Sequence, residues 1–314
     1  MKQLFALLTA GLLACSTARP QAPSCATPGN DNAFLGIQTI RLWSGPAPQA
    51  KGETCDDIPA LTVFDPVNGA PNGSAVVIFP GGSYSILVGN GEGREIADWF
   101  TERGFRAFVV ASRLSSHGYL LPVPLLDAQR AIQLVRARAL DYHIAPNRIV
   151  VIGFSGGGNL AALAATKFVP GNPADDDPID RASSRPDYLV LGYPLIDAVS
   201  SDRYCKSFNV TEDRCKELIA AYSPRLFVGK DTPPAFIYHT LTDPRVPAQQ
   251  SLDFYQALIK AGVPAELHIF ANGPHGSGLG RGDPALDLWP GLLEAWLRAQ
   301  GLLTVDKDAV GATP

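Results

Sequence analysis

One serine stands at the junction of a buried strand and a helix, a position from which a side chain can act as a nucleophile. An apolar run at residues 149–152 leads into Gly153-Phe154-Ser155-Gly156-Gly157, and an Ala/Leu-rich stretch follows. The pattern Gly-x-Ser-x-Gly requires this context of strand, tight turn and helix. Glycines at 153 and 157 let the two elements approach closely, while the strained turn presents the hydroxyl above the sheet. We therefore expect Ser155 to be a nucleophile.

A serine hydroxyl needs a base within hydrogen-bond reach, and the chain has five histidines. Two of them precede Ser155, and His239 and His268 lie inside predicted strands, where a structural imidazole is expected. His275 differs because it lies in Gly273-Pro274-His275-Gly276, a loop just past a predicted strand. Active-site residues of parallel sheets gather in such loops. We expect His275 to be the base, with a surface loop histidine as the alternative.

An acid that orients the base is expected at Asp243, which follows the predicted strand 235–240 and precedes a predicted helix. Its structural alternative is a helix N-cap or an Asx-turn, because Asp before Pro also suits those roles. One helix and one strand fit between Asp243 and His275, so both loops can open on the same edge of the sheet. The chain order Ser155, Asp243, His275 is the one expected of α/β-hydrolases.

Attack by Ser155 on an ester carbonyl would create an oxyanion, which needs preorganised N–H donors worth about 10²- to 10³-fold in rate each. One donor should be the backbone of Gly156. The others should come from an earlier strand-to-helix loop, and the predicted strand 75–79 leads directly into Pro80-Gly81-Gly82-Ser83-Tyr84. We expect the N–H groups of Gly82 and Ser83 to complete the oxyanion hole; the alternative is an ordinary Gly-rich turn.

The elements that must position these residues follow an α/β pattern. Strands are predicted at residues 37–43, 60–64, 75–79, 105–110, 148–152, 188–192, 235–240 and 265–270. Several are continuous apolar runs, as expected of parallel strands covered on both faces. Helices are predicted at 124–140 and 246–261. We expect a mostly parallel central sheet of about eight strands with helices on both faces, mixed because the segments before residue 75 look antiparallel.

Two sets of charged residues are expected to carry no function. Arg130, Arg136 and Arg138 lie around the predicted helix 124–140 and are interpreted as its solvated face. The run Asp175-Asp176-Asp177 could attract a cation, but a solvated loop is the preferred interpretation. We predict no metal site and no cofactor, since the chain contains no Gly-x-Gly-x-x-Gly, Walker or His-Glu-x-x-His motif.

The chain resembles α/β-hydrolase fold serine esterases, in particular secreted or lipoprotein carbohydrate esterases of the acetyl xylan and feruloyl esterase type. The similarity spans about residues 60–300, and its motifs are Pro80-Gly81-Gly82-Ser83-Tyr84, residues 125–132, residues 153–157, Asp243 with Val246-Pro247, and Pro274-His275-Gly276. Pro80 stands where many relatives have His, and Ser83 where they have a third Gly. Neither change removes an N–H from Gly82 or Ser83, so the differences bear on acyl preference.

The resemblance implies a secreted serine carboxylic ester hydrolase that removes acetyl groups from acylated saccharides through an acyl-enzyme. A feruloyl or general short-chain carboxylesterase is the alternative activity. The alternative of another class is a hydrolase-fold binding protein without catalysis, which would be expected to lack one of Ser155, Asp243 and His275. Nucleic acid is disfavoured as a partner because the net charge is -4 and no basic run occurs.

The predicted organisation begins with a signal peptide at residues 1–18, since the apolar run at 4–14 is too short to span a bilayer. Its end is open between a small-residue cleavage site and a lipobox-like sequence that would place a lipid on Cys15. We expect secretion or a periplasmic location, with membrane anchoring, as in an outer-membrane-type lipoprotein, only if Cys15 is lipidated. A Pro-rich leader (19–35), a single α/β-hydrolase domain (36–302) and a flexible tail (303–314) follow.

Two further expectations concern loops of this domain. Residues 195–230 form a candidate cap or pocket wall; a satellite core of aromatic residues is the alternative. Cysteines support export, because four remain once Cys15 is set aside, and an even number permits disulfides in an oxidising compartment. Proximity in the sequence suggests two pairs, Cys25 with Cys55 and Cys205 with Cys215. Unpaired buried thiols are the alternative.

Overall fold

The computed structural model describes residues 32–34, 36–69, 71–197 and 211–304. Eight strands form one sheet in the order β1-β2-β4-β3-β5-β6-β7-β8. Their bounds are β1 Thr39–Arg41, β2 Ala60–Phe64, β3 Ala75–Phe79, β4 Arg106–Ala111, β5 Ile149–Phe154, β6 Tyr188–Gly192, β7 Ala235–Thr240 and β8 Ala265–Phe270. The pairs β1·β2 and β2·β4 are antiparallel and every other pair is parallel. The predicted fold class, a mostly parallel mixed sheet, is confirmed.

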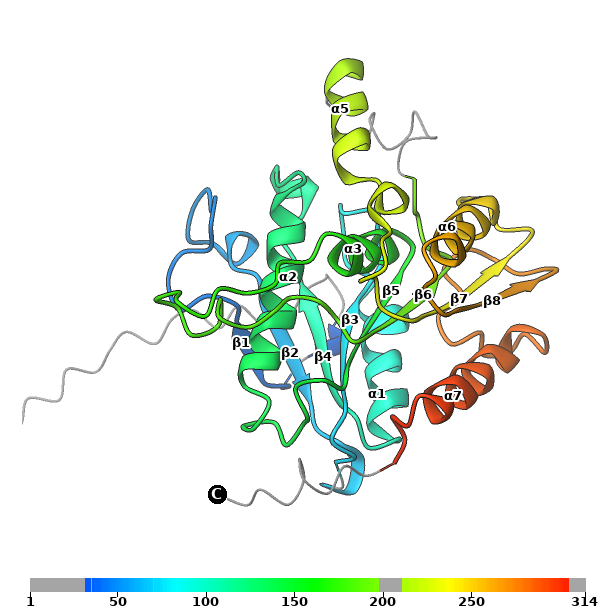
Figure 1. The fold of residues 1–314 in the computed structure, drawn as a ribbon, viewed down its shortest axis with the longest axis horizontal. Helices are drawn as coiled ribbons and strands as arrows, with labels where there is room; N and C mark the ends of the chain where they lie inside the picture. The colour runs from blue at the N-terminus through cyan, green and yellow to red at the C-terminus, as the bar shows by residue number, and fades with distance from the viewer. Residues whose placement is uncertain (1–31, 35, 70, 198–210, 305–314) are drawn as a thin grey trace, which may run out of the picture.

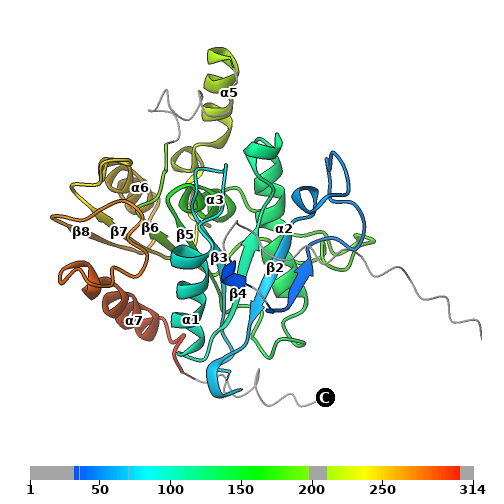
Figure 2. The same cartoon turned by 180° about the vertical axis from the view of Figure 1, so that it is seen from behind.

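Helices cover both faces of this sheet (Figure 1). The helices are α1 Glu95–Thr101, α2 Val123–Ala137, α3 Ser155–Thr166, α5 Glu212–Tyr222, α6 Gln249–Lys260 and α7 Trp289–Ala299. Buried side chains of α2, α3 and α6 share one hydrophobic cluster with one face, and those of α1 and α7 share a second cluster with the other. Figure 2 shows the same arrangement from behind, with α5 projecting beyond the layers. None of the helices in the described part of the chain has the length and apolar character needed to cross a membrane.

The central strands form because their side chains are apolar on both faces. Every residue of β3 and of β5 is buried. Burial of apolar surface on both sides is the main term that stabilises such a strand, at about 25 cal/mol per Å². The carboxyl ends of these two neighbouring strands therefore end at a fixed edge of a rigid sheet, and the loops that follow them carry the candidate site.

A buried ion pair fixes the loop after β4. Arg113 and Asp127 are 1% and 0% exposed in their side chains, and Nη2 of the arginine lies 2.6 Å from Oδ1 of the aspartate. Asp127 Oδ2 also accepts from the backbone N–H of Arg113 at 2.9 Å. The pair joins the end of β4 to α2. Two residues after Arg113, Ser115 donates its backbone N–H to the carbonyl of Tyr84 at 2.8 Å. The loop after β4 thereby supports the loop after β3.

The interpretation of the α2 arginines as a solvated face is wrong for Arg130. This residue is 4% exposed, and its guanidinium donates to Asp180 at 2.8 Å and to Asp177 at 2.5 Å. Arg136 likewise pairs with Asp187 at 3.0 Å, whereas Arg138 is exposed as expected. The loop before β6 lies across α2. It covers the face of α2 that the spacing of polar residues in the sequence predicts to be exposed to solvent. Asp177 therefore anchors this loop and is not a free solvated carboxylate.

A short segment before residue 36 also contributes to the core. The 3-10 helix η1 (Asn32–Phe34) places Phe34 in the core at 1% exposure, with its ring centroid 6.1 Å from that of Phe64. The expected signal peptide, Cys15, Cys25, Cys205 and the tail from residue 305 lie outside the described residues. Cys55 begins the short helix η2 (Cys55–Asp57) and Cys215 is a buried residue of α5. The disulfide pairing, like the cap at 195–230, stays a prediction.

Candidate active site

Ser155 occupies a strained turn between β5 and α3, as the motif predicts. Its φ is 52°, a left-handed conformation that costs free energy for any residue with a Cβ. A Cβ on Gly153 would lie 2.3 Å from the carbonyl oxygen of Gly157, and one on Gly157 would lie 2.1 Å from that of Phe79. Both glycines are therefore required for the close approach of strand and helix. The turn leaves the serine only 7% exposed but at the edge of the sheet.

The structure brings the three predicted side chains into one hydrogen-bonded row. His275, in the loop after β8, has Nε2 2.8 Å from Ser155 Oγ, although 120 residues separate them. Its Nδ1 lies 2.7 Å from Asp243 Oδ2. Because a carboxylate only accepts, the Nδ1 carries the proton and Nε2 is left to accept from the serine hydroxyl. This is the tautomer that a general base requires.

Asp243 makes the contacts expected of an Asx-turn and also faces the imidazole of His275. Its Oδ1 accepts hydrogen bonds from the backbone N–H groups of Arg245 and Val246 at 2.8 and 2.9 Å. These bonds form an Asx-turn in the segment that precedes α6. Its Oδ2 is left to face His275. Burial pushes the pKa of Asp243 upward, but hydrogen bonds from His239, His275 and the two backbone donors outweigh burial and hold this pKa well below its usual range. The carboxylate therefore stays ionised beside the imidazole.

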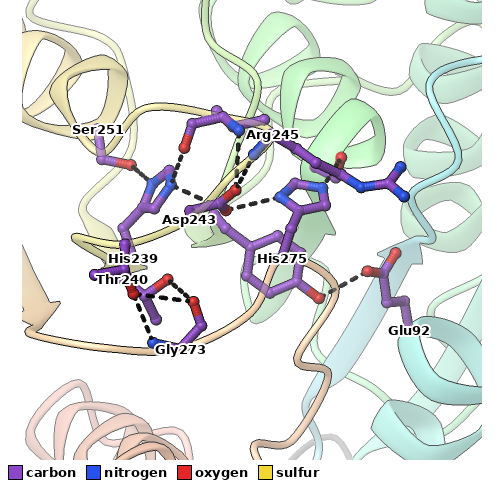
Figure 3. A network of polar contacts seen from close by, with 12 residues as sticks. Glu92, His239, Thr240, Asp243, Arg245, Ser251, Gly273 and His275 are labelled. Carbon is purple, nitrogen blue, oxygen red and sulfur yellow. Dashed lines mark hydrogen bonds and ion pairs between the residues drawn. The ribbon is translucent and has the colours of Figure 1, made fainter.

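His239 lies next to Asp243, a contact that sequence reasoning missed. The prediction that this strand histidine has satisfied ring nitrogens is confirmed: Nδ1 lies 2.7 Å from Ser251 Oγ and Nε2 lies 2.9 Å from the carbonyl oxygen of Val246. Since that carbonyl only accepts, Nε2 carries the proton, which also points toward Asp243 Oδ2 at 3.4 Å. Figure 3 shows Asp243 between the imidazoles of His239 and His275. The sequence signal that could have indicated this contact is a histidine in the strand that precedes Asp243, four residues before the acid.

The loop after β3 has an unusual backbone conformation and lies against the turn that carries Ser155. Gly82, Ser83 and Tyr84 have φ values of 123°, 54° and 61°, three consecutive residues in the left-handed half of conformational space. A Cβ on Gly156 would lie 3.0 Å from the nitrogen of Ser83, so the two predicted donor segments are in contact. The N–H groups of Gly82 and Ser83 donate to no other residue within the described ranges. They are available, with the first N–H groups of α3, to bind an oxyanion.

Ser155, His275 and Asp243 are joined by hydrogen bonds at the end of parallel strands of a mostly parallel sheet. This is the arrangement of serine hydrolases of the α/β-hydrolase fold. The comparisons with known proteins agree. The chain belongs to the BD-FAE family, whose family model matches residues 61–258.

Curated relatives of the chain are named as esterases, as a carboxylic ester hydrolase or as a xylanase. Over 226 residues the chain is 33% identical to the acetylxylan esterase of Xylanibacter ruminicola, covering 70% of this chain and 44% of the relative. A solved structure described as an acetyl ester-xyloside bifunctional hydrolase, from Caldicellulosiruptor lactoaceticus, matches with a TM-score of 0.77 and 36% identity over 84% of this chain and 97% of that one. The propionate-bound esterase 2 of Thermogutta terrifontis matches with a TM-score of 0.68 and 27% identity, covering 86% and 96% of the two chains. The chain spans less than half the length of the first three curated relatives.

Proposed function

We propose that this protein hydrolyses short-chain acyl esters and that its substrates are acetylated saccharides of the xylan type. The observation that carries the proposal is the pair of contacts at His275, 2.8 Å to Ser155 Oγ and 2.7 Å to Asp243 Oδ2. A relative named for acetylxylan and a similar structure named for an acetyl ester and a xyloside support the substrate class. An ester substrate of this kind needs no cofactor in the proposed mechanism.

In the proposed acylation step, Ser155 Oγ attacks the ester carbonyl while His275 Nε2 takes the hydroxyl proton. Asp243 stabilises the imidazolium that forms and keeps it oriented. The carbonyl oxygen becomes an oxyanion, which accepts hydrogen bonds from the backbone N–H groups of Ser83, Gly82 and Gly156. The C–O bond to the alcohol then breaks, and His275 delivers its proton to the leaving oxygen. Acyl-Ser155 and a free sugar hydroxyl result.

Deacylation repeats the sequence with water. His275 Nε2 accepts a proton from the water as its oxygen attacks the acyl carbonyl, and the same oxyanion hole holds the second tetrahedral intermediate. The C–O bond to Ser155 breaks, and the proton returns to the serine oxygen. The products are a carboxylic acid and the enzyme in its starting protonation state.

A short acyl group is favoured over a feruloyl group by the similar structures. Structures of the Thermogutta terrifontis esterase 2, at 27% and 26% identity to this chain, are described with propionate and with butyrate bound. The alternative of a binding protein without catalysis is disfavoured because Ser155, His275 and Asp243 are all of the right type and all in contact.

A substrate panel tests the proposal. Acetate, butyrate, octanoate and ferulate esters and an acetylated xylo-oligosaccharide are compared by kcat/KM, with Ser155→Ala as the blank. We expect kcat/KM for the acetyl ester to be at least about tenfold higher than for the octanoate, because extra methylenes that a pocket cannot hold lower kcat/KM by about this factor. We also expect the enzyme to release acetate from the oligosaccharide. Preference for ferulate would replace the acetyl assignment, and absence of hydrolysis across the panel would support the binding protein instead.

Export is proposed as well, on the sequence of residues 1–18 alone. A polymeric substrate such as xylan is met outside the cell, which agrees with a secreted or periplasmic enzyme. Lipidation of Cys15 would tether the enzyme to a membrane surface without a spanning helix.

A further inference from the structure

A buried carboxyl group that the proposed mechanism does not use lies beside the site. Glu92 belongs to the single π-helical turn η4 (Asn90–Arg94) that leads into α1, and it is 3% exposed. Its Oε2 accepts the backbone N–H of Gly81 at 2.7 Å, and its Oε1 accepts the hydroxyl of Tyr193 at 2.7 Å. Figure 3 shows Glu92 approaching the His275 group from the side opposite to His239. Both oxygens are therefore committed to donors from two different loops.

The Glu92 contacts join the loop that carries the oxyanion donors to the loop that carries the base. Gly81 directly precedes Gly82 in the loop after β3. Tyr193 follows β6; its hydroxyl oxygen also accepts the backbone N–H of Gly278 at 3.1 Å, and its ring centroid lies 5.0 Å from that of His275, edge to face. One carboxyl group thus connects both halves of the reaction machinery through Gly81 on one side and Tyr193 on the other.

The loop after β3 needs such an anchor because its backbone is strained. Consecutive left-handed conformations at Ser83 and Tyr84 cost of order 1–3 kcal/mol each and persist only where the surroundings hold them. The far end of the loop is held at Tyr84, whose hydroxyl donates to Asn159 at 2.6 Å. Glu92 holds the near end, and it does so closely: a Cβ on Gly81 would lie 2.4 Å from Glu92 Oε2.

We propose that Glu92 is a positioning residue that fixes the oxyanion donors and His275 relative to Ser155, by bonding Gly81 and Tyr193 at once. The inference rests on the proposed function. Burial of this carboxyl is costly, and it raises the pKa of Glu92 above its ordinary value, against the opposing effect of the hydrogen bonds from Tyr193 and Gly81. Among the described residues the carboxyl accepts hydrogen bonds only from Gly81 and Tyr193, so the free energy spent on burying it serves the geometry of the site.

The variant Glu92→Gln tests this role with little change in volume. Both partners donate to the carboxyl, whereas a carboxamide offers one acceptor oxygen and one NH₂. If its oxygen keeps the bond to Gly81, its NH₂ must donate to the Tyr193 hydroxyl, whose oxygen already accepts from Gly278, so the bond to Tyr193 is reversed and weakened. We expect kcat on an acetyl ester to fall about 10- to 100-fold, the effect of a misplacement of about 1 Å, while KM changes less than about threefold. The matched control is Asp98→Asn on the neighbouring α1, an exposed carboxylate paired with Arg94 at 3.2 Å, which should keep wild-type kcat.

Tyr193→Phe provides a second variant that keeps the ring against His275 and removes only the hydroxyl. If the two residues act through one connection, the double variant should lose about as much activity as the more impaired single variant rather than the product of the two losses. Independent, multiplying losses would overturn the connection. This variant also carries the test if Glu92→Gln does not fold, as judged by its thermal unfolding.

Two measurements separate positioning from a merely structural role. The rate of Ser155 labelling by a fluorophosphonate should fall with kcat, and the affinity for an alkylboronic acid, which forms a tetrahedral adduct with the serine, should weaken in parallel. Wild-type labelling rate and boronate affinity in Glu92→Gln would overturn the inference. Labelling of Ser155 needs no ester turnover. A wild-type protein whose Ser155 is labelled but that cleaves no acyl ester would contradict the proposed function. The labelling rate of Glu92→Gln would still decide the role of Glu92.

Discussion

Replacing Ser155 by alanine is expected to lower kcat on an acetyl ester on the order of 10⁶-fold, because Oγ is the atom that forms the acyl bond and nothing else within the row of contacts can replace it. The remaining rate would come from direct attack of water on the ester, with the oxyanion stabilised by the same backbone N–H groups. Stability should change little, since alanine and serine experience the same strain at a φ of 52°. Steady-state kinetics and thermal unfolding of the two proteins measure both quantities.

The matched control for this variant is Ser183→Ala, a serine whose hydroxyl bonds the carbonyl of Val169 at 3.1 Å in an exposed loop. It should retain the activity of the wild type. Retention of more than about a hundredth of the activity by Ser155→Ala, with contaminating esterases excluded, would place the nucleophile elsewhere.

Replacing Asp243 by asparagine is expected to lower turnover on the order of 10⁴-fold, the loss that the same change causes in a Ser-His-Asp triad. The amide oxygen can keep the Asx-turn bonds to Arg245 and Val246, so the backbone stays in place. The amide NH₂ then faces His275 Nδ1 in the position of Oδ2. An NH₂ donates, which favours the tautomer with the proton on Nε2, and that nitrogen can no longer accept from Ser155.

Activity of Asp243→Asn is measured as kcat/KM on the acetyl ester, with Asp253→Asn on α6 as the control. Asp253 accepts from Gln249 at 2.7 Å at an exposed site, and its change should leave the rate unaltered. A variant that keeps more than about a tenth of wild-type activity would show that another group orients His275.

The fold and the row Ser155, His275, Asp243 were predictable because each rests on a local pattern. Continuous apolar runs mark strands buried on both faces, and the glycines around Ser155 are demanded by contacts of 2.1 to 2.3 Å that any Cβ would make. Loops that follow parallel strands meet at one edge whatever their length. Proximity of Asp243 and His275 therefore follows from topology, not from their separation in the chain.

The supporting residues were not predictable because their environment is built by distant elements. Glu92 lies in the polar, glycine-containing stretch Asn90-Gly91-Glu92-Gly93, which has the composition of a solvated loop, yet Gly81 and Tyr193 enclose it. Arg130 has the periodicity of an exposed residue and is covered by the loop before β6. Left-handed backbone at Ser83 and Tyr84 is likewise invisible in the sequence, because neither residue type signals it.

The central claim, that Ser155 carries an acyl group during turnover, is tested most directly by rapid acid quenching of the wild-type reaction with an acetyl ester, followed by peptide mass mapping. We expect an acetyl group on the peptide that contains Ser155, assigned to that side chain by fragmentation, and none on that peptide from Ser155→Ala. Turnover that leaves Ser155 unmodified at every quench time, with the acetyl group found on another residue, would contradict the account.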